Sequence, residues 1–150
     1  MKQGFLNALG GHVSGLVLYG LIVAGIGQDE FVIAHYCVDI QQFASRLLVN
    51  ILLANGDAHL KNWSMIYHDK SAPRLSPAYD ILMTSVYIEN ERHFALNLAK
   101  NKDWYLAEMK HFEQWAEKVG VPWRVIEKQL HAIMDKARSV WPVLLLDLPM

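Results

Sequence analysis

Residues 55–62 read NGDAHLKN, and residues 75–80 read LSPAYD. Within these stretches, Asp57 precedes Asn62 by five positions and Asp80 follows Asn62 by eighteen. Phosphoryl transfer uses a carboxylate that accepts the proton of the attacking hydroxyl. It also uses an amide oxygen and a second carboxylate that hold Mg²⁺ against the phosphates. Mg²⁺ prefers a few protein oxygens beside phosphate and water. The order of these side chains therefore predicts a phosphoryl-transfer site.

Taken singly, these residues have simpler interpretations. The stretch 55–57 is also a turn sequence, and Asp80 could cap a helix that begins at Ile81. A single histidine such as His59 is more often a structural imidazole than a ligand. A zinc site is not expected, because Cys37 has no cysteine partner and no second histidine stands at ligand spacing. The joint occurrence of base, amide and second carboxylate favours phosphoryl transfer.

The wider pattern is N-x-D-x-H-x-K-N at residues 55–62, then an apolar stretch, a polar turn and LSPAYD at residues 75–80. It resembles the catalytic core of the HipA-like serine/threonine kinases, which are the toxins of bacterial toxin–antitoxin pairs. The resemblance runs from about Asp39 to Ala137 and includes HFALNL at residues 93–98. It implies the C-terminal lobe of a protein-kinase-like fold.

The resemblance also implies roles for individual residues. Asp57 would be the catalytic base, and Asn62 and Asp80 would be the ligands of Mg²⁺. Lys61 would neutralise the transferring phosphate, although it could equally point to solvent. His59 would support catalysis by fixing the loop through backbone hydrogen bonds.

The resemblance to the HipA-like kinases also implies cofactors and partners. ATP would donate the phosphoryl group, with Asn55 and Lys61 as contacts, although Asn55 could instead fix the loop. The acceptor would be a serine of a protein substrate. An antitoxin would be the partner and would carry the DNA recognition, so direct nucleic-acid binding by this chain is not expected.

Aminoglycoside and choline phosphotransferases are an alternative family. They carry a similar loop, G-D-x-H-x-x-N, which residues 56–59 and Asn62 also fit. The chemistry would be the same and the acceptor would be a small molecule. The Lys61-Asn62 pair and LSPAYD at residues 75–80 favour the HipA-like kinases.

Composition indicates one globular domain. The chain has 150 residues, of which 53% are hydrophobic and 19% charged, enough to bury a core. The net charge is −1, and no basic run indicates a nucleic-acid surface. A single cysteine excludes an internal disulfide and suits a reducing cytoplasm.

The two ends of the chain are apolar, and we divide it into residues 1–38, 39–141 and 142–150. Residues 3–28 carry no Asp, Glu, Lys or Arg and hold seven of the nine glycines. A signal peptide or membrane segment is one interpretation, but a buried or interface-packing segment is favoured. The tail from 142 would need a partner surface.

The nucleotide-covering loop and phosphate-pairing lysine of a kinase N-terminal lobe are not found in this sequence. We therefore expect a C-terminal lobe alone, and a kinase that is incomplete by itself. The alternative from another class is a non-catalytic binding module, or a split-kinase subunit, that pairs with an antitoxin or a separate N-terminal lobe.

The predicted fold is mainly helical with one small hairpin. Asp39 and Gln42 predict the capped start of a helix over 39–54, with apolar residues at helical spacing. Residues 63–67 and 74–76 predict a hairpin that brings Asn62 and Asp80 to one side. A helix capped by Asp103 is expected over 104–119, ended by Gly120, and a further one from Pro122 to Pro142.

Overall fold

The computed structural model describes residues 30–67 and 73–146. Helices, strands and short 3-10 turns (η) follow one another in this order: α3 Glu30–Leu52, η1 Leu60–Asn62, β1 Met65–Tyr67, β2 Pro73–Leu75, η2 Thr84–Val86, β3 His93–Leu98, β4 Asn101–Asp103, η3 Trp104–Leu106, α4 Met109–Val119 and α5 Arg124–Leu146. The fold is therefore mostly helical with two small antiparallel sheets.

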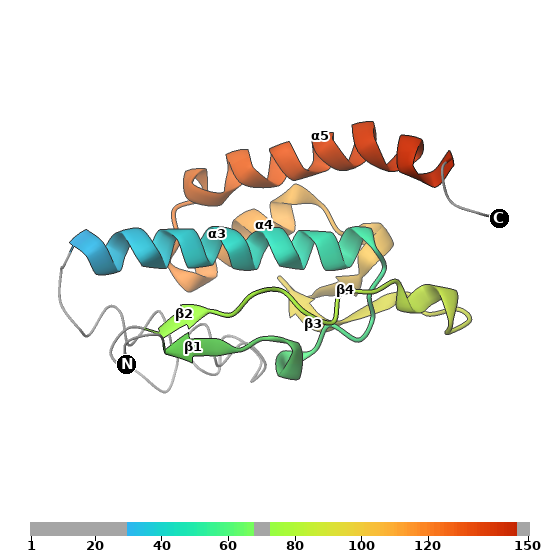
Figure 1. Ribbon diagram of the computed structural model, residues 1–150, viewed down its shortest axis with the longest axis horizontal. Helices are drawn as coiled ribbons and strands as arrows, with labels where there is room; N and C mark the ends of the chain where they lie inside the picture. Colours follow the sequence, from blue (N-terminus) through green and yellow to red (C-terminus); the bar gives the residue numbers. More distant parts are fainter. Residues whose placement is uncertain (1–29, 68–72, 147–150) are drawn as a thin grey trace.

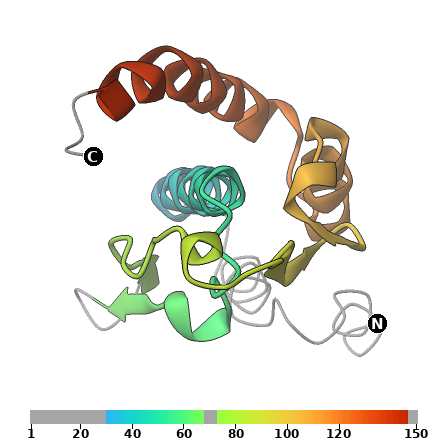
Figure 2. The ribbon, with the colours of Figure 1, turned by 90° about the vertical axis from the view of Figure 1, so that its right-hand side faces the viewer.

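Helix α3 is the centre of the fold. In Figure 1, α5 lies along one side of α3 and the β1–β2 hairpin lies on the other. Figure 2 looks nearly along α3 and shows α4 and the β3–β4 sheet closing a third side. The core that α3 shares with these elements consists of Ile40, Phe43, Ala44, Leu47, Leu48, Ile51, Phe94, Leu98, Trp104, Phe112, Trp115, Ala116, Val121, Ile126 and Leu130.

The apolar spacing predicted for α3 is confirmed, but its predicted start is wrong. The helix begins at Glu30, so Asp39 lies in its interior and caps nothing. The Asp39 side chain, only 3% exposed, instead pairs with Arg74 and accepts a hydrogen bond from the Leu75 N–H. An aspartate that serves a tertiary contact inside a helix gives the same local pattern as a cap.

The predicted hairpin is confirmed. Strands β1 and β2 pair antiparallel, with Met65 opposite Leu75 and Tyr67 opposite Pro73. Most of the predicted turn, residues 68–72, lies outside the described residues. β2 ends before Pro77, as expected for a residue that cannot donate to the ladder. The hairpin sets the distance between the two stretches of the candidate site.

The second sheet, β3–β4, was not predicted. Burial alternates along β3, with Phe94, Leu96 and Leu98 turned inward. Ala99 and Lys100 both have left-handed φ angles, 49° and 70°, which suits a tight hairpin turn. The period-2 pattern was present in HFALNL, but Ala99-Lys100 lacks the asparagine or glycine that normally marks such a turn.

Two helix boundaries also need correction. Asp103 caps only η3, where its carboxylate accepts from the Tyr105 N–H, and α4 starts afresh after Glu108. Pro142 does not end α5, which continues to Leu146. Proline has a helical φ of its own; it removes one backbone donor and crowds the carbonyl four residues earlier, which can kink a helix without ending it. The predicted stop at Gly120 is confirmed by its left-handed φ of 75°.

Two tryptophans, Trp115 and Trp123, belong to the core region. Trp115 is 4% exposed and lies 5.6 Å from Phe43, ring centre to ring centre, while Trp123 packs against the same core. Trp141, on α5, is half-buried. In residues 30–67 and 73–146, no helix combines the length and apolarity that a membrane span requires.

Candidate functional site

The site begins where α3 ends. Ala54 takes a left-handed φ of 51°, which turns the chain out of the helix axis. The Asn55 N–H then donates to the Asn50 carbonyl at 2.9 Å. The loop that carries Asp57 is thus fixed to the last turns of the central helix.

Asn55 is the buried junction of the site. Its side chain is fully buried, and its Nδ2 donates to Oδ1 of Asn50 at 2.7 Å and to the Asp80 carbonyl at 3.3 Å. Its Oδ1 accepts from the Asp57 N–H at 3.1 Å. Asn55 therefore joins the helix, the loop and the Asp80 backbone. This placement favours its loop-fixing role, and its contact with a nucleotide stays a prediction.

Asp57 faces solvent beside His59. The Asp57 side chain is 62% exposed, and its Oδ1 lies 3.4 Å from Nε2 of His59. The His59 N–H donates to the Asp57 carbonyl at 2.7 Å. A carboxylate in this position is open to an incoming hydroxyl, while the imidazole beside it restricts where it can point.

The structure brings Asn62 and Asp80 together, as the hairpin predicts. Nδ2 of Asn62 donates a hydrogen bond to Oδ2 of Asp80. Asp80 holds a left-handed φ of 57° and caps nothing, since the next turn, η2, begins at Thr84 after Met83. The alternative of Asp80 as a helix cap is therefore wrong.

The environment of this pair fits a magnesium ion. Oδ1 of Asn62 is buried and finds no hydrogen-bond partner within residues 30–67 and 73–146. Rotation of the amide by a half turn would direct Oδ1 toward Asp80 and present two oxygens to one cation. A cleft of about 10 Å³, the space of roughly one water or ion, adjoins both side chains. The described residues hold no cluster of three His, Cys, Asp or Glu, and Mg²⁺ in phosphate sites commonly uses only one or two carboxylates.

Tyr79 has a role that the sequence did not reveal. Its hydroxyl donates to the Lys61 carbonyl at 2.8 Å and lies 2.6 Å from the Ser64 hydroxyl. Lys61 and Ser64 stand on either side of Asn62 in the chain. Tyr79 thus ties the segment before Asp80 to both flanks of Asn62. The Lys61 side chain is exposed. Its contacts with ATP and with the transferring phosphate stay predictions.

Arg46 contributes positive charge to the same cleft. It lines the cleft from α3, and its Nη1 donates to the Ser76 carbonyl at 2.5 Å. Burial lowers the pKa of the Arg46 guanidinium below its ordinary value, while the nearby Asp39 carboxylate acts in the opposite direction. Because an arginine stays protonated in proteins, this cation fixes the segment that leads from β2 to Asp80.

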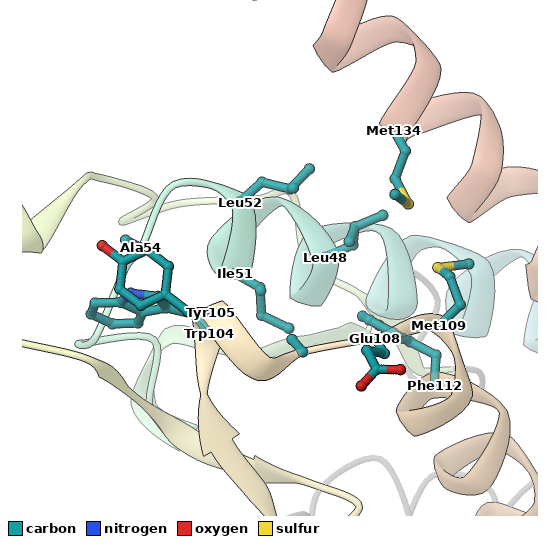
Figure 3. A pocket seen from close by; sticks show the side chains of 11 residues that line it. Leu48, Ile51, Leu52, Ala54, Trp104, Tyr105, Glu108, Met109, Phe112 and Met134 are labelled. Atoms are coloured by element: carbon teal, nitrogen blue, oxygen red, sulfur yellow. The ribbon is translucent and has the colours of Figure 1, made fainter.

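A second pocket, of about 290 Å³, lies between α3, η3, α4 and α5. Figure 3 shows Met109 and Met134 pointing toward each other across it, with Leu48 and Ile51 on the α3 side. Glu108 is the only carboxylate in its lining, which is otherwise mostly apolar. A mostly apolar wall with one carboxylate and no cationic side chain is a poor site for a metal–phosphate group, so the polar cleft remains the candidate site.

The fold and the site together define a member of a known domain family. Residues 30–141 match the family model described as the HipA-like C-terminal domain. The chain belongs to this family. The match also decides between the two families that the loop sequence left open, in favour of the HipA-like one.

Curated relatives share the same region. The chain is 38% identical over 112 residues to "Putative kinase Y4dM" of Sinorhizobium fredii, covering 75% of this chain and 27% of that protein. A "Putative kinase" of Haemophilus influenzae is 32% identical over 97 residues, covering 61% of this chain and 28% of that protein. The chain therefore spans about a quarter of the length of these relatives.

A solved structure has the same fold. The HipA of Shewanella oneidensis, in a complex with HipB and its operator DNA, superposes with a TM-score of 0.61 at 24% identity. The superposition covers 73% of this chain and 26% of that HipA chain. The likeness confirms that this mostly helical domain with its small sheets resembles the C-terminal region of HipA.

Proposed function

We propose that this domain carries the catalytic loop and magnesium site of an ATP-dependent serine/threonine kinase of HipA type, with the architecture of a kinase C-terminal lobe. The observation that carries the proposal is the meeting of Asn62 and Asp80, eighteen residues apart in sequence. The buried Oδ1 of Asn62 has no hydrogen-bond partner among the described residues. The relatives named as kinases and the family match support the same class.

In this proposal each side chain has a distinct task. Asp57, whose side chain is 62% exposed, accepts the proton of the acceptor serine hydroxyl as that oxygen attacks the γ-phosphorus of ATP and the bond to the leaving ADP breaks. Oδ1 of Asn62 and the Asp80 carboxylate hold Mg²⁺, which when bound neutralises charge on the phosphates of ATP. The exposed Lys61 reaches the transferring phosphate, and His59 limits the orientations of Asp57.

The test is calorimetric titration of the chain with ATP, with and without Mg²⁺. We expect Mg²⁺-dependent binding that Asp80→Asn removes, since an amide replaces the charged ligand. Asp135→Asn is the matched control, because this aspartate is 76% exposed on α5, in a salt bridge with Arg138. Equal binding by the wild type and Asp80→Asn, in folded protein, contradicts the proposed metal site.

A binding module remains the second candidate function. Val143, Leu144 and Leu146, at the end of α5, are between 54% and 85% exposed. Such an apolar surface favours a protein partner, and an antitoxin is the partner class that the likeness to HipA in its complex with HipB makes the natural choice. Kinase activity that is absent with and without a nucleotide-lobe polypeptide, together with tight antitoxin binding, would favour this second function.

A further inference from the structure

A buried threonine contacts the loop that carries Asp57. Thr84, only 6% exposed, belongs to η2 in the segment that follows Asp80. Its Oγ1 accepts a hydrogen bond from the Gly56 N–H at 2.7 Å. The residue next to the proposed catalytic base is thus held by a side chain from 28 positions further along the chain.

Thr84 is itself held by a carboxylate. Its Oγ1 lies 2.6 Å from Oε2 of Glu91 and 3.2 Å from the Ala54 carbonyl. A hydroxyl has one proton to donate, and the shorter contact, to an ionised oxygen, makes the stronger bond. Donation to Glu91 leaves the lone pairs of Oγ1 for the Gly56 N–H, so the three groups form one chain of hydrogen bonds.

Glu91 also fills the space over Gly56. A Cβ built on Gly56 would lie 2.1 Å from Oε1 of Glu91. A side chain at this position would therefore displace the Glu91 carboxylate from its contact with Thr84. The close approach places the Glu91 side chain against the peptide that leads into Asp57.

We infer that Thr84 and Glu91 are positioning residues for Asp57. Thr84 acts through the Gly56 N–H, and Glu91 acts through the Thr84 hydroxyl. The inference rests on the proposed function for its last step, which is that Asp57 accepts the proton. Because the Asp57 side chain is largely exposed, its place is set by the backbone on which it stands. A displacement of about 1 Å in such a group can cost on the order of 10²-fold in rate.

Two substitutions separate the hydroxyl from the shape of the side chain. Thr84→Val keeps the branched shape and removes the acceptor of the Gly56 N–H, whereas Thr84→Ser keeps the acceptor. We expect Thr84→Val to raise the amide exchange rate of Gly56 at least about tenfold and to lower kcat about 10–100-fold. KM for ATP should stay within about twofold, because the ligands Asn62 and Asp80 are untouched. Thr84→Ser should stay within about twofold of the wild type in every quantity.

Glu91→Met is the second variant, because methionine matches the length of glutamate without its oxygens. We expect the same changes in smaller measure, since Thr84 still accepts from Gly56. Amide exchange of Phe43 and Leu47, both in the core, reports whether either variant loosens the whole fold. Unchanged exchange in the core with raised exchange at Gly56 localises the effect to the loop.

The outcomes distinguish the inference from the proposed function. Transfer that is normal in Thr84→Val overturns the inference, even if the Gly56 amide exchanges faster, because Thr84 would then be structural only. Unchanged exchange at Gly56 in Thr84→Val also overturns it, because the hydroxyl would not hold the loop. Absence of transfer by the wild-type chain with its nucleotide partner defeats the proposed function itself, and the positioning role falls with it.

Discussion

The buried carboxylate of Asp39 and the guanidinium of Arg74 join the central helix to the hairpin. Nη2 and Nε of Arg74 lie 3.1–3.2 Å from the Asp39 oxygens, and the Leu75 N–H adds a further bond at 3.1 Å. The hairpin that carries Asn62 and Asp80 at its outer ends is thereby fixed on the same helix that delivers Asp57. The spacing between the proposed base and the proposed metal ligands depends on this contact.

Replacement of Arg74 should therefore destabilise the fold. Arg74→Met removes the Arg74 guanidinium from the buried Asp39 carboxylate, which keeps the Leu75 N–H and the nearby charge of Arg46. Loss of one partner of a buried ion pair should then cost up to about 3 kcal/mol. Denaturant unfolding followed by circular dichroism measures this change. Arg138→Met is the control, since its partner Asp135 is 76% exposed and such pairs contribute little. If the two variants have the same free energy of unfolding, the Asp39–Arg74 pair does not stabilise the fold.

Tyr79 should matter for metal affinity more than for stability. Tyr79→Phe removes one hydroxyl, which frees the Lys61 carbonyl and the Ser64 hydroxyl on the two sides of Asn62. We expect Mn²⁺, used as a paramagnetic probe for the Mg²⁺ site, to bind about 5–10-fold more weakly, since a lost hydrogen bond is worth about 1 kcal/mol. Tyr87→Phe is the control, because that ring is 81% exposed. Equal Mn²⁺ affinity in the wild type and Tyr79→Phe contradicts this role.

The sequence predicted the meeting of Asn62 and Asp80 better than the framework around it. These two residues and Asp57 could be singled out because a phosphoryl-transfer site needs particular groups in a particular order; their roles stay predictions. Core residues of α3 could be found because burial imposes a period of 3.6. The roles of three other residues, Thr84, Glu91 and Arg46, could not be predicted from the sequence. Each contacts a residue that only the fold brings near, and no local sequence pattern marks such a contact.

The errors at helix ends have the same origin. Asp39 looks like a cap because aspartate favours both a helix start and a tertiary ion pair, and only the position of Arg74 decides between them. Pro142 looks like a stop because proline removes a backbone donor and crowds the preceding turn, yet α5 continues past it. Local chemistry permits each alternative, and tertiary contacts select one.

Gly120 should be sensitive to any side chain. Its φ of 75° ends α4 in the left-handed region, and a Cβ there would meet no atom within 4 Å. Gly120→Ala should therefore cost about 1 kcal/mol through backbone strain alone. Gly120→Asn should cost less, because asparagine tolerates this conformation. Thermal unfolding of the two variants measures the difference, and a cost for asparagine equal to or above that for alanine contradicts the backbone explanation.

The pKa of Glu108 should depend on its hydrogen bond with Lys110. The hydrogen bond from Nζ of Lys110, at 2.8 Å, lowers the pKa of the Glu108 carboxyl below its ordinary value. A carboxyl whose pKa is depressed in the folded state stabilises the fold above the unfolded pKa, and this contribution is lost as the pH falls through the folded pKa. Lys110→Met should raise the pKa of Glu108 toward its ordinary value. An NMR titration of the side-chain carboxyl measures this shift, and an unchanged pKa contradicts the assignment of its cause.

A paired experiment should distinguish the proposed base from the proposed metal ligand. Asp57→Asn removes the proposed proton acceptor and leaves the Asn62–Asp80 pair intact. We expect transfer to a serine peptide to fall about 10²–10⁴-fold while Mg²⁺-dependent ATP binding persists. Asp80→Asn should remove both binding and transfer, because it takes away the charged ligand. Transfer rates and calorimetry on the same protein samples, with Asp135→Asn as the exposed control, provide the comparison. If Asp57→Asn loses ATP binding as well, Asp57 belongs with the metal ligands and another group must accept the proton. If it keeps full transfer, the loop positions the substrate without acting on the proton.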